Sequence, residues 1–349
     1  MRAIGTANYA YVVARVRHRR SALFGEEEYR KLLRMGPGGI ARFMEDTEYG
    51  AEITDLGARY DGVDLIEYAL NANIAKHFDD LLRWSNGRLY DLVARYLRKF
   101  DAWNAKTVLR GIYSEATEEE IRADLIDAGE FDETFLDSLV AADSIEAVTD
   151  LLADTTIGHG IEDAYAEYEE TELLVPLENA IDRAYYERLA GETLHGGRAI
   201  ELYEQFLEAE IDFRNMRNAL RIERSGADID PAEYFIEGGS LFDAGEIRSL
   251  AGNRDELLAR IRESRYGEDL SEAIDDLESA ESLIDFEHAL DGAIVSYADY
   301  LSHVYPLSVC PVLAYVVAKE REVNNIRAIA RGLEAGLERE QIEAELVTL

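Results

Sequence analysis

The sequence predicts an all-α protein made of three homologous helical domains, and three observations support this fold class. Only 5 of the 349 residues are proline, so long stretches can continue as helix without losing a backbone N–H donor. Alanine, leucine, glutamate and arginine, which all favour helix, are common throughout. A polar motif also returns twice at a regular spacing, and the hydrophobic content of 47% is enough to give each copy a core.

The charge balance is strongly acidic: 36 lysine and arginine residues stand against 72 aspartate and glutamate residues, which gives 36 − 72 = −36. Self-repulsion of this size destabilises a compact fold in dilute buffer, whereas molar salt shortens the screening length to about 3 Å. We interpret the acidity as adaptation to a salt-rich cytoplasm, with an acidic binding surface as the alternative. We expect no nucleic-acid partner, because there is no large basic face to displace counterions from phosphates.

The repeated motif has the pattern acid-x-x-Asn-x-basic-x-x-apolar-Arg. Its copies begin at Asp101, Asp212 and Glu322, so the steps in sequence number are 212 − 101 = 111 and 322 − 212 = 110. Two other sets of segments keep nearly the same step, namely Ile66-Glu67 with Leu177-Glu178 and Phe286-Glu287, and Phe131-Asp132 with Phe242-Asp243. This period exceeds that of ordinary solenoid units. Each copy is therefore predicted to be a small helical domain, and the three domains span residues 1-145, 146-252 and 253-349.

Helices are predicted where apolar residues recur three and four positions apart. The segment from Leu89 to Phe100 shows this amphipathic pattern, and the segment 309–317 shows it again. A further helix start is predicted at Ser114 or Thr117. Glu120 lies three residues after Thr117, which is the spacing of a capping box.

On a helix, the motif places its acid on the buried face. Successive residues turn by about 100°, and the positions four, seven and eight after the acid, which lie near it around the helix, are apolar in all three copies. The asparagine falls on the flank of that face. Because buried polar groups need hydrogen-bond partners, we expect the acids and asparagines to tie loops or helix ends to the core. These residues are Asp101, Asn104, Asp212, Asn215, Glu322 and Asn325.

The two basic residues of the motif lie four positions apart on the other side of the helix. Like charges at this spacing destabilise a helix by roughly 0.2–0.5 kcal/mol, so a pair that occurs three times needs a reason. Neighbouring carboxylates within the fold would supply one, and a surface presented to an acidic partner would supply another; the sequence leaves both open. The candidate partner-binding residues are Lys106, Arg110, Arg217, Arg221, Arg327 and Arg331.

Sequence motifs for catalysis are absent. The six histidines include no His-Glu-x-x-His pair, and neither a Gly-x-x-x-x-Gly-Lys-Ser/Thr phosphate loop nor a Gly-x-Ser-x-Gly nucleophile elbow occurs. We therefore predict no catalytic residue, no metal, no cofactor and no small-molecule substrate. The single cysteine, Cys310, excludes an internal disulfide and is expected to be a small buried apolar group.

The sequence also predicts where the protein is found. No apolar run approaches the roughly 20 residues of a membrane-spanning helix. Near the start, the apolar patch from Tyr9 to Ala14 precedes its arginines, which is the reverse of the order in a signal peptide. We expect a soluble, cytoplasmic protein that can sit against a membrane complex.

Two segments carry a resemblance to a known family. Near the C-terminus, the stretch from Pro306 to Ile329 combines an apolar helix around Tyr315, the dipeptide Lys319-Glu320 and the third copy of the motif. Near the N-terminus, the segment from Tyr9 to Tyr49 has an arrangement of tyrosine, arginine and apolar residues that resembles the N-terminus of the same family. Together they make the chain resemble the C subunit, called d in eukaryotes, of the archaeal and vacuolar-type rotary ATPases, and its haloarchaeal members in particular.

The resemblance implies a funnel-shaped, pseudo-threefold arrangement of the three domains and no catalytic activity. It implies a peripheral place on the cytoplasmic face of the cell membrane, between the proteolipid (c/K) ring and the central-stalk subunits D and F, among the other subunits of an ATP synthase. There the protein would turn with the rotor and couple ATP chemistry to proton or sodium transport. The basic pairs are then candidates for lining the mouth that receives the stalk.

Two other functions stay open from the sequence alone. A free-standing helical scaffold or regulatory protein of a halophile would share the repeat and the lack of catalytic motifs, and copurification would separate it from an ATPase subunit. An all-helical enzyme with an unfamiliar carboxylate site would need a pocket lined by acids of perturbed pKa.

Overall fold

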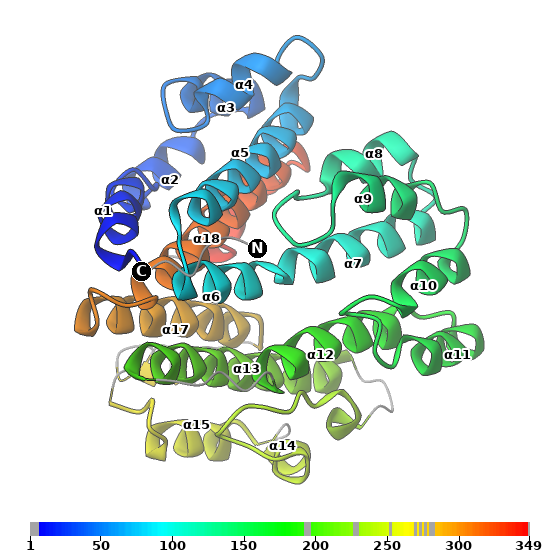
Figure 1. Ribbon diagram of the computed structural model, residues 1–349. Coiled ribbons are helices and arrows are strands. Elements are labelled where there is room, and N and C mark those ends of the chain that lie inside the picture. Colours follow the sequence, from blue (N-terminus) through cyan, green and yellow to red (C-terminus); the bar gives the residue numbers. More distant parts are fainter. Residues whose placement is uncertain are drawn as a thin grey trace. The chain divides into compact units, whose positions relative to one another are not determined.

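The computed structural model describes residues 7–191, 197–225, 230–250, 253–268 and 283–347, together with positions 271, 274, 275 and 278. All regular secondary structure within these ranges is helical (Figure 1). The predicted all-α fold class is therefore confirmed.

By packing, the chain divides into two compact units. Of the described residues, the first unit contains 67–191 and Ala7, and the second contains 8–66 and those from 197 onward. The boundary falls inside helix α5 (Gly62–Trp84), between Ile66 and Glu67. The predicted domains 1-145, 146-252 and 253-349 follow the sequence repeat instead of this packing, and they stay a prediction.

The first unit is organised around the helix that carries the first copy of the motif, α7 (Lys99–Tyr113). The other helices of this unit, besides α5, are α6 (Arg88–Leu97), α8 (Glu118–Asp124), α9 (Glu133–Val140), α10 (Ile145–Ala153), α11 (Ile161–Thr171) and α12 (Val175–Gly191). Helix α7 packs against α8, α9, α10 and α12 (Figure 1). Its buried apolar face includes Phe100, Ala105, Val108 and Leu109.

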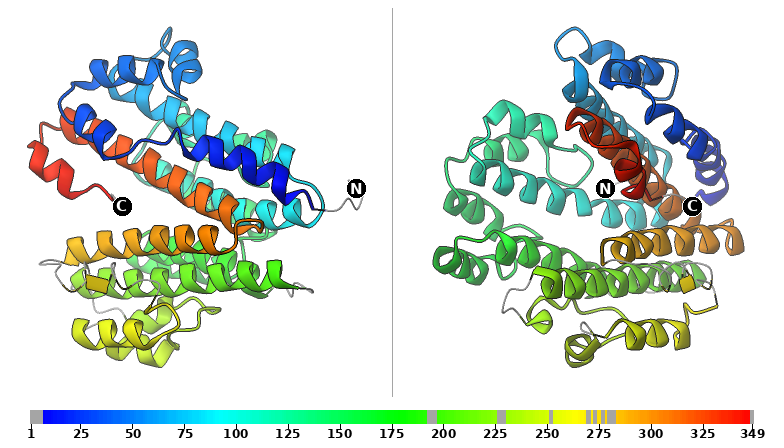
Figure 2. Two further views of the ribbon diagram at one scale, coloured as in Figure 1. Left: turned by 90° about the vertical axis from the view of Figure 1, so that its left-hand side faces the viewer. Right: turned by 180° about the vertical axis from the view of Figure 1, so that it is seen from behind.

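The second unit is organised in the same way around α18 (Cys310–Glu334), the helix of the third copy. Its other described helices are α1 (Tyr9–Arg20), α2 (Glu26–Leu32), α3 (Pro37–Glu45), α4 (Gly50–Leu56), α13 (Arg198–Ser225), η1 (Pro231–Tyr234), α14 (Ala244–Leu250), α15 (Arg254–Glu263), α17 (Leu283–Val304) and α19 (Arg339–Ala344). Helices α1 and α17 flank α18, and α13, which carries the second copy, runs beside α17 (Figure 2).

Side chains at helix starts explain several element boundaries. Thr117 accepts a hydrogen bond from the Glu120 N–H, and the Glu120 carboxylate accepts one from the Thr117 N–H at 2.8 Å. Helix α8 thus begins with the predicted capping box. The alternative start at Ser114 is wrong: this residue closes α7, and its hydroxyl donates to the Gly111 carbonyl at 3.2 Å. Side-chain acceptors also cap α9, α10 and α15, and they are Asp132, Ser144 and Asn253.

The predicted helix from Leu89 to Phe100 is in fact two helices. Helix α6 ends at Leu97 and α7 begins at Lys99. Arg98 between them keeps near-helical dihedral angles of φ −58° and ψ −14°, so no loop intervenes. The apolar spacing runs across the break because both helices bury that face, with Leu97 and Phe100 each at most 3% exposed.

Two further expectations concern the apolar segment at 309–317 and the membrane. The segment forms the start of α18, where Cys310 is 2% exposed, as expected for a small buried group. Among the helices of the described ranges, none combines the length and the apolarity that crossing a bilayer requires.

Glycine permits close helix packing at two matching positions. A Cβ on Gly111 would collide with Ile121 of α8, and a Cβ on Gly332 would lie 2.7 Å from the Ile342 side chain of α19. The sequence numbers of the two glycines differ by 332 − 111 = 221, which is two repeat periods. The same close contact between a motif helix and a short following helix is therefore built twice.

Replacing Gly111 by alanine is expected to lower the free energy of unfolding by about 1–3 kcal/mol, because Ile121 must move to admit the methyl group. Gly38→Ala is the matched control, since a Cβ there meets nothing within 4 Å and alanine favours helix. Chemical denaturation at one fixed salt concentration measures both variants. Equal stability of G111A and the unmodified protein would contradict this packing.

Candidate functional site

The acid of the first motif copy, Asp101, is buried and bonded to backbone. Its side chain is 0% exposed. Its carboxylate accepts hydrogen bonds from the N–H groups of Glu130 and Phe131, each at 2.9 Å. Because these two residues lead into α9, the acid on α7 fixes the loop between α8 and α9.

Asp212 on α13 repeats this arrangement in the second copy. Its carboxylate accepts hydrogen bonds from the N–H groups of Ser240 and Leu241, each at 3.0 Å. The Tyr266 hydroxyl donates a further hydrogen bond at 3.0 Å. The loop held here precedes α14, just as the loop at Phe131 precedes α9.

In the third copy, the acid is Glu322 of α18 and its partners come from the N-terminal part of the chain. Its Oε1 accepts a hydrogen bond from the Phe24 N–H at 2.8 Å, and its Oε2 accepts one from the Tyr49 hydroxyl at 2.8 Å. Phe24 lies 298 residues before Glu322, whereas the loops held by the other two acids lie 28 to 30 residues after them.

The N-terminal segment nevertheless has the same local structure as those loops. Phe24 is followed by Gly25, the N-cap of α2, as Phe131 is followed by Asp132, the N-cap of α9. The segment that starts at Phe24 therefore takes, in the third copy, the position that the following loop takes in the other two.

In all three copies, the side-chain amide of the motif asparagine makes two hydrogen bonds to the backbone of a single residue. Asn104 donates to the Ile126 carbonyl and accepts from the Ile126 N–H, both at 2.9 Å. Asn215 makes the same pair of 2.9 Å bonds with Ile236. Asn325 makes them with the backbone of residue 347, at 3.0 and 3.1 Å. Each asparagine thus holds the backbone of a residue 21 or 22 positions further along the chain.

A second element recurs at nearly the same period and was not predicted. Thr47, Thr155 and Ser264 each donate their hydroxyl to the carbonyl three residues earlier, at 2.6–2.7 Å, and accept from the N–H two residues later. The steps in sequence number are 155 − 47 = 108 and 264 − 155 = 109. The signal in the sequence is an acid, Ser or Thr, two variable residues and glycine, which is a short pattern that other turns share.

This second element faces the first. The residue just before its glycine is Tyr49, Ile157 or Tyr266, and both tyrosines donate their hydroxyl to a motif acid. Ile157 has no hydroxyl, so the first copy lacks this bond. Asp101 is instead satisfied by backbone N–H groups.

Lys319 makes the third copy electrostatically distinct. It is 1% exposed, and its Nζ lies 2.8 Å from both Glu322 Oε2 and the Tyr49 hydroxyl. The ammonium group also stands 4.1 Å from the centre of the Tyr49 ring, a cation–π geometry. Burial lowers the pKa of Lys319, while the charge of Glu322 opposes that shift. A buried ion pair of this kind holds its elements together only while both partners are present.

Burial also shifts the pKa of the two aspartates. Desolvation raises the pKa of Asp101 to about 6, although the N–H groups of Phe131 and Glu130 favour its charged form. The pKa of Asp212 is raised for the same reason, against the N–H groups of Leu241 and Ser240. Both carboxylates are at most 1% exposed, so their chemistry is to hold loops and not to meet a substrate.

The basic pairs of the first two copies lie beside carboxylates of their own unit. Lys106 Nζ is 2.6 Å from Asp182, and Arg110 binds both oxygens of Glu178, at 2.6 and 2.9 Å. In the second copy Arg217 pairs with Asp291. Asp291 is the counterpart of Asp182 in the repeat, since 291 − 182 = 109.

The other three candidate partner-binding residues are Arg221, Arg327 and Arg331. The side chain of Arg221 lies outside the described residues. In the third copy, Arg327 donates to Asn324 at 3.2 Å, and Arg331 is exposed on α18. The ion pairs of the first two copies favour neighbouring carboxylates within the fold as the reason for Lys106, Arg110 and Arg217. Contact with an acidic partner stays a prediction for all six basic residues.

Metal-ligand geometry is missing from the described part of the chain. No group of three or more histidine, cysteine, aspartate or glutamate side chains in it is arranged to hold an ion.

Comparison with known proteins finds one family and several relatives along almost the whole chain. The model of the ATP synthase (C/AC39) subunit family matches residues 12–345. A protein from Haloferax volcanii, named as the C subunit of an A-type ATP synthase, is 63% identical over 349 residues, 100% of both chains. Its namesake from Halobacterium salinarum is 60% identical over 352 residues, again 100% of both. The namesake from Methanosarcina acetivorans is 35% identical, over 99% of this chain and 94% of its own.

Asp101 should make stability depend on pH in a defined direction. A folded-state pKa of about 6, above the unfolded value of about 4, means that its stabilising contribution is fully present below about pH 4 and is lost as pH rises through 6. Relative to Asp101→Asn, which cannot titrate, the native protein should lose on the order of 3 kcal/mol of unfolding free energy between pH 4 and pH 7. Denaturation of both proteins across this range measures the difference. A constant difference would contradict the raised pKa.

Removing the buried ammonium group of Lys319 should lower the free energy of unfolding far more than removing an exposed one. Lys319→Met leaves the buried Glu322 side chain without its ammonium partner, and we expect it to lower the free energy of unfolding by about 3–5 kcal/mol. Lys31→Met is the matched control, because Lys31 also pairs with a glutamate three residues away but is 52% exposed. This control should change stability by less than about 1 kcal/mol. Equal effects of the two substitutions in denaturation experiments would refute the role of burial.

Proposed function

Because the chain belongs to the ATP synthase (C/AC39) subunit family, we propose that it is a non-catalytic rotor subunit, which couples the soluble central stalk of an ATP synthase to its membrane proteolipid ring. The observation that carries the proposal is similarity over 100% of the chain, at 63% identity, to a protein named as the C subunit of an A-type ATP synthase. The chain is thus a subunit of an ATP synthase, and its mechanical position is the proposed part.

The packing of the described residues supports a mechanical role. A piece that passes torque between two partners must resist deformation. The three motif helices each hold a loop or terminal segment through buried acid and asparagine side chains. These bonds lie in the core, where water and salt screen them little.

The proposed place in the complex follows from the family. The chain would form a pseudo-threefold funnel on the cytoplasmic face of the membrane, with central-stalk subunits D and F at its mouth and the proteolipid (c/K) ring at its narrow end. Rotation of this assembly would link ATP synthesis or hydrolysis to the movement of protons or sodium ions. The chain itself would bind no cofactor and carry no active site.

The six basic residues are proposed to serve two purposes. Lys106, Arg110 and Arg217 join neighbouring helices, and the exposed members of the pairs can also face an acidic partner. Arg110 is 52% exposed despite its ion pair with Glu178. Its outer edge is therefore the first place to test for a stalk contact.

The coupling role predicts a specific set of companions. When the tagged chain is isolated from gently solubilised haloarchaeal membranes in molar KCl, the nucleotide-binding subunits, the stalk pair and the proteolipid ring should copurify with it. Purified chain should also bind the isolated D–F pair. A chain that emerges alone while still helical by circular dichroism would instead favour a free-standing scaffold or regulatory protein.

A charge swap separates the internal and external roles of Arg110. Arg110→Glu should lower the free energy of unfolding by about 1 kcal/mol, because its ion pair is partly exposed, and adding Glu178→Arg should restore it. If Arg110 also contacts the stalk, the double variant keeps its stability but binds the D–F pair more weakly than the unmodified chain. Full affinity of the double variant would limit Arg110 to its internal role.

A further inference from the structure

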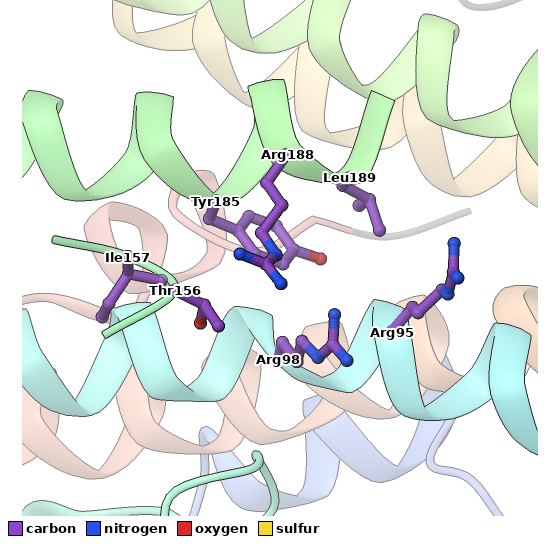
Figure 3. A pocket seen from close by; sticks show the side chains of 7 residues that line it. All are labelled: Arg95, Arg98, Thr156, Ile157, Tyr185, Arg188 and Leu189. Carbon is purple, nitrogen blue, oxygen red and sulfur yellow. The ribbon is translucent and has the colours of Figure 1, made fainter. Parts of the chain in front are cut away.

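A hollow in the first unit is lined by three arginines. Arg95 and Arg98 reach it from α6 and the α6–α7 junction, and Arg188 reaches it from α12. Figure 3 shows the guanidinium groups of Arg98 and Arg188 pointing toward each other across the space, with Arg95 further along the same side as Arg98. Thr156 and Ile157 close one end.

The matching positions of the second copy are filled by apolar and aromatic side chains. With a step of 111 along α6 and α7 and of 109 along α12, the three arginines correspond to residues that are at most 1% exposed. These residues are Phe206 (95 + 111), Ala209 (98 + 111) and Tyr297 (188 + 109). The fold therefore packs these positions as core in one copy, and the arginines are a particular feature of the other.

The space itself arises from one further difference. Ile157 stands where the second copy has Tyr266, since 266 − 157 = 109. The Tyr266 ring packs edge-on against Tyr297 with their centres 5.2 Å apart, and both are 0% exposed. The shorter isoleucine and the arginine at position 188 replace this aromatic pair. The hollow is thus left where two rings would otherwise meet.

The charged side chains that line the hollow are all arginines, in a protein of net charge −36. None of the residues that line it is acidic, although 72 of the 349 residues are aspartate or glutamate. Arg98 does have a carboxylate beside it, that of Glu130, with Nε–Oε2 at 2.8 Å. Guanidinium groups facing each other repel, and an anion between them turns that repulsion into attraction. Their planar donor forks match the oxygens of carboxylates and phosphates.

The size of the hollow limits what fits. The space is about 230 Å³ only when the open solvent at its mouth is included, so its enclosed part is much smaller than that. The hollow can therefore be considered only for a single small group, such as one phosphate ion or one carboxylate, and not for a ligand as large as a nucleotide. Thr156 offers a hydroxyl donor at the same site.

We propose that this hollow binds a single small oxyanion, held by Arg98 and Arg188 with Arg95 beside them. The oxyanion is either inorganic phosphate from solution or a carboxylate side chain of another subunit, and the two share the same recognition chemistry. Binding of free phosphate would not depend on the coupling role proposed above, whereas binding of a carboxylate from a neighbouring subunit would.

Titration calorimetry of the full chain with inorganic phosphate, at fixed ionic strength in KCl, tests the first source. Ile157→Tyr introduces the tyrosine found in the other two copies and should fill the hollow without changing its charge. Arg188→Gln removes one of the guanidinium groups. Each should weaken phosphate binding at least tenfold. Arg30→Gln is the control, because Arg30 is exposed and pairs with Glu26 one helical turn away. This variant should bind phosphate like the unmodified chain.

The same variants test the second source through isolation of the complex from membranes. If phosphate does not bind, but I157Y and R188Q are recovered with less of the other subunits than R30Q, the occupant is a carboxylate of a neighbouring subunit. If no other subunit is recovered with any of these proteins, R30Q and the unmodified chain included, the result counts against the coupling role and not against the anion site. Phosphate binding by I157Y that equals that of the unmodified chain overturns the proposal. So does a chain that neither binds phosphate nor changes its recovery in either variant.

Discussion

A buried acid that accepts hydrogen bonds from the backbone of another segment is the interaction on which both units depend. Asp101, Asp212 and Glu322 each occupy the central face of a motif helix and are at most 1% exposed. A carboxylate in that position is costly without partners, and a loop N–H is costly without an acceptor. Each loop therefore docks only where the helix presents its acid, and each acid is tolerated only where the loop docks.

This mutual requirement suits a protein of net charge −36. Molar salt relieves the repulsion between surface carboxylates, but it also weakens exposed ion pairs, since the screening length falls to about 3 Å at 1 M. The ties of Asp101, Asn104 and the Lys319–Glu322 pair are buried and escape that screening. The stiffness that the proposed coupling role needs would thus rest on contacts that molar salt leaves intact.

The sequence identified the helices and the tie-forming positions because periodicity and burial are local properties. An acid and an asparagine on an apolar helix face must find partners, and that argument needs no structure. The identity of the partners did not follow, because Phe24 lies 298 residues from Glu322 and no local pattern joins them. Lys319 belongs to the family signature, but its place in the core does not follow from the sequence, because lysine is almost never buried without a partner. The second recurring element, the turn closed by the hydroxyls of Thr47, Thr155 and Ser264, does not follow from the sequence because its pattern is short and other turns share it.

The most direct test of this architecture is native-state hydrogen exchange at the backbone N–H groups of Phe24, Phe131 and Leu241. These three amides donate to Glu322, Asp101 and Asp212, and local opening sets how fast they exchange. If the buried acids hold each unit's loops to its core, all three amides will exchange as slowly as the central helices, although they lie in loops. Exchange at the rate of exposed loop amides would show that the ties open freely and that rigidity comes from elsewhere.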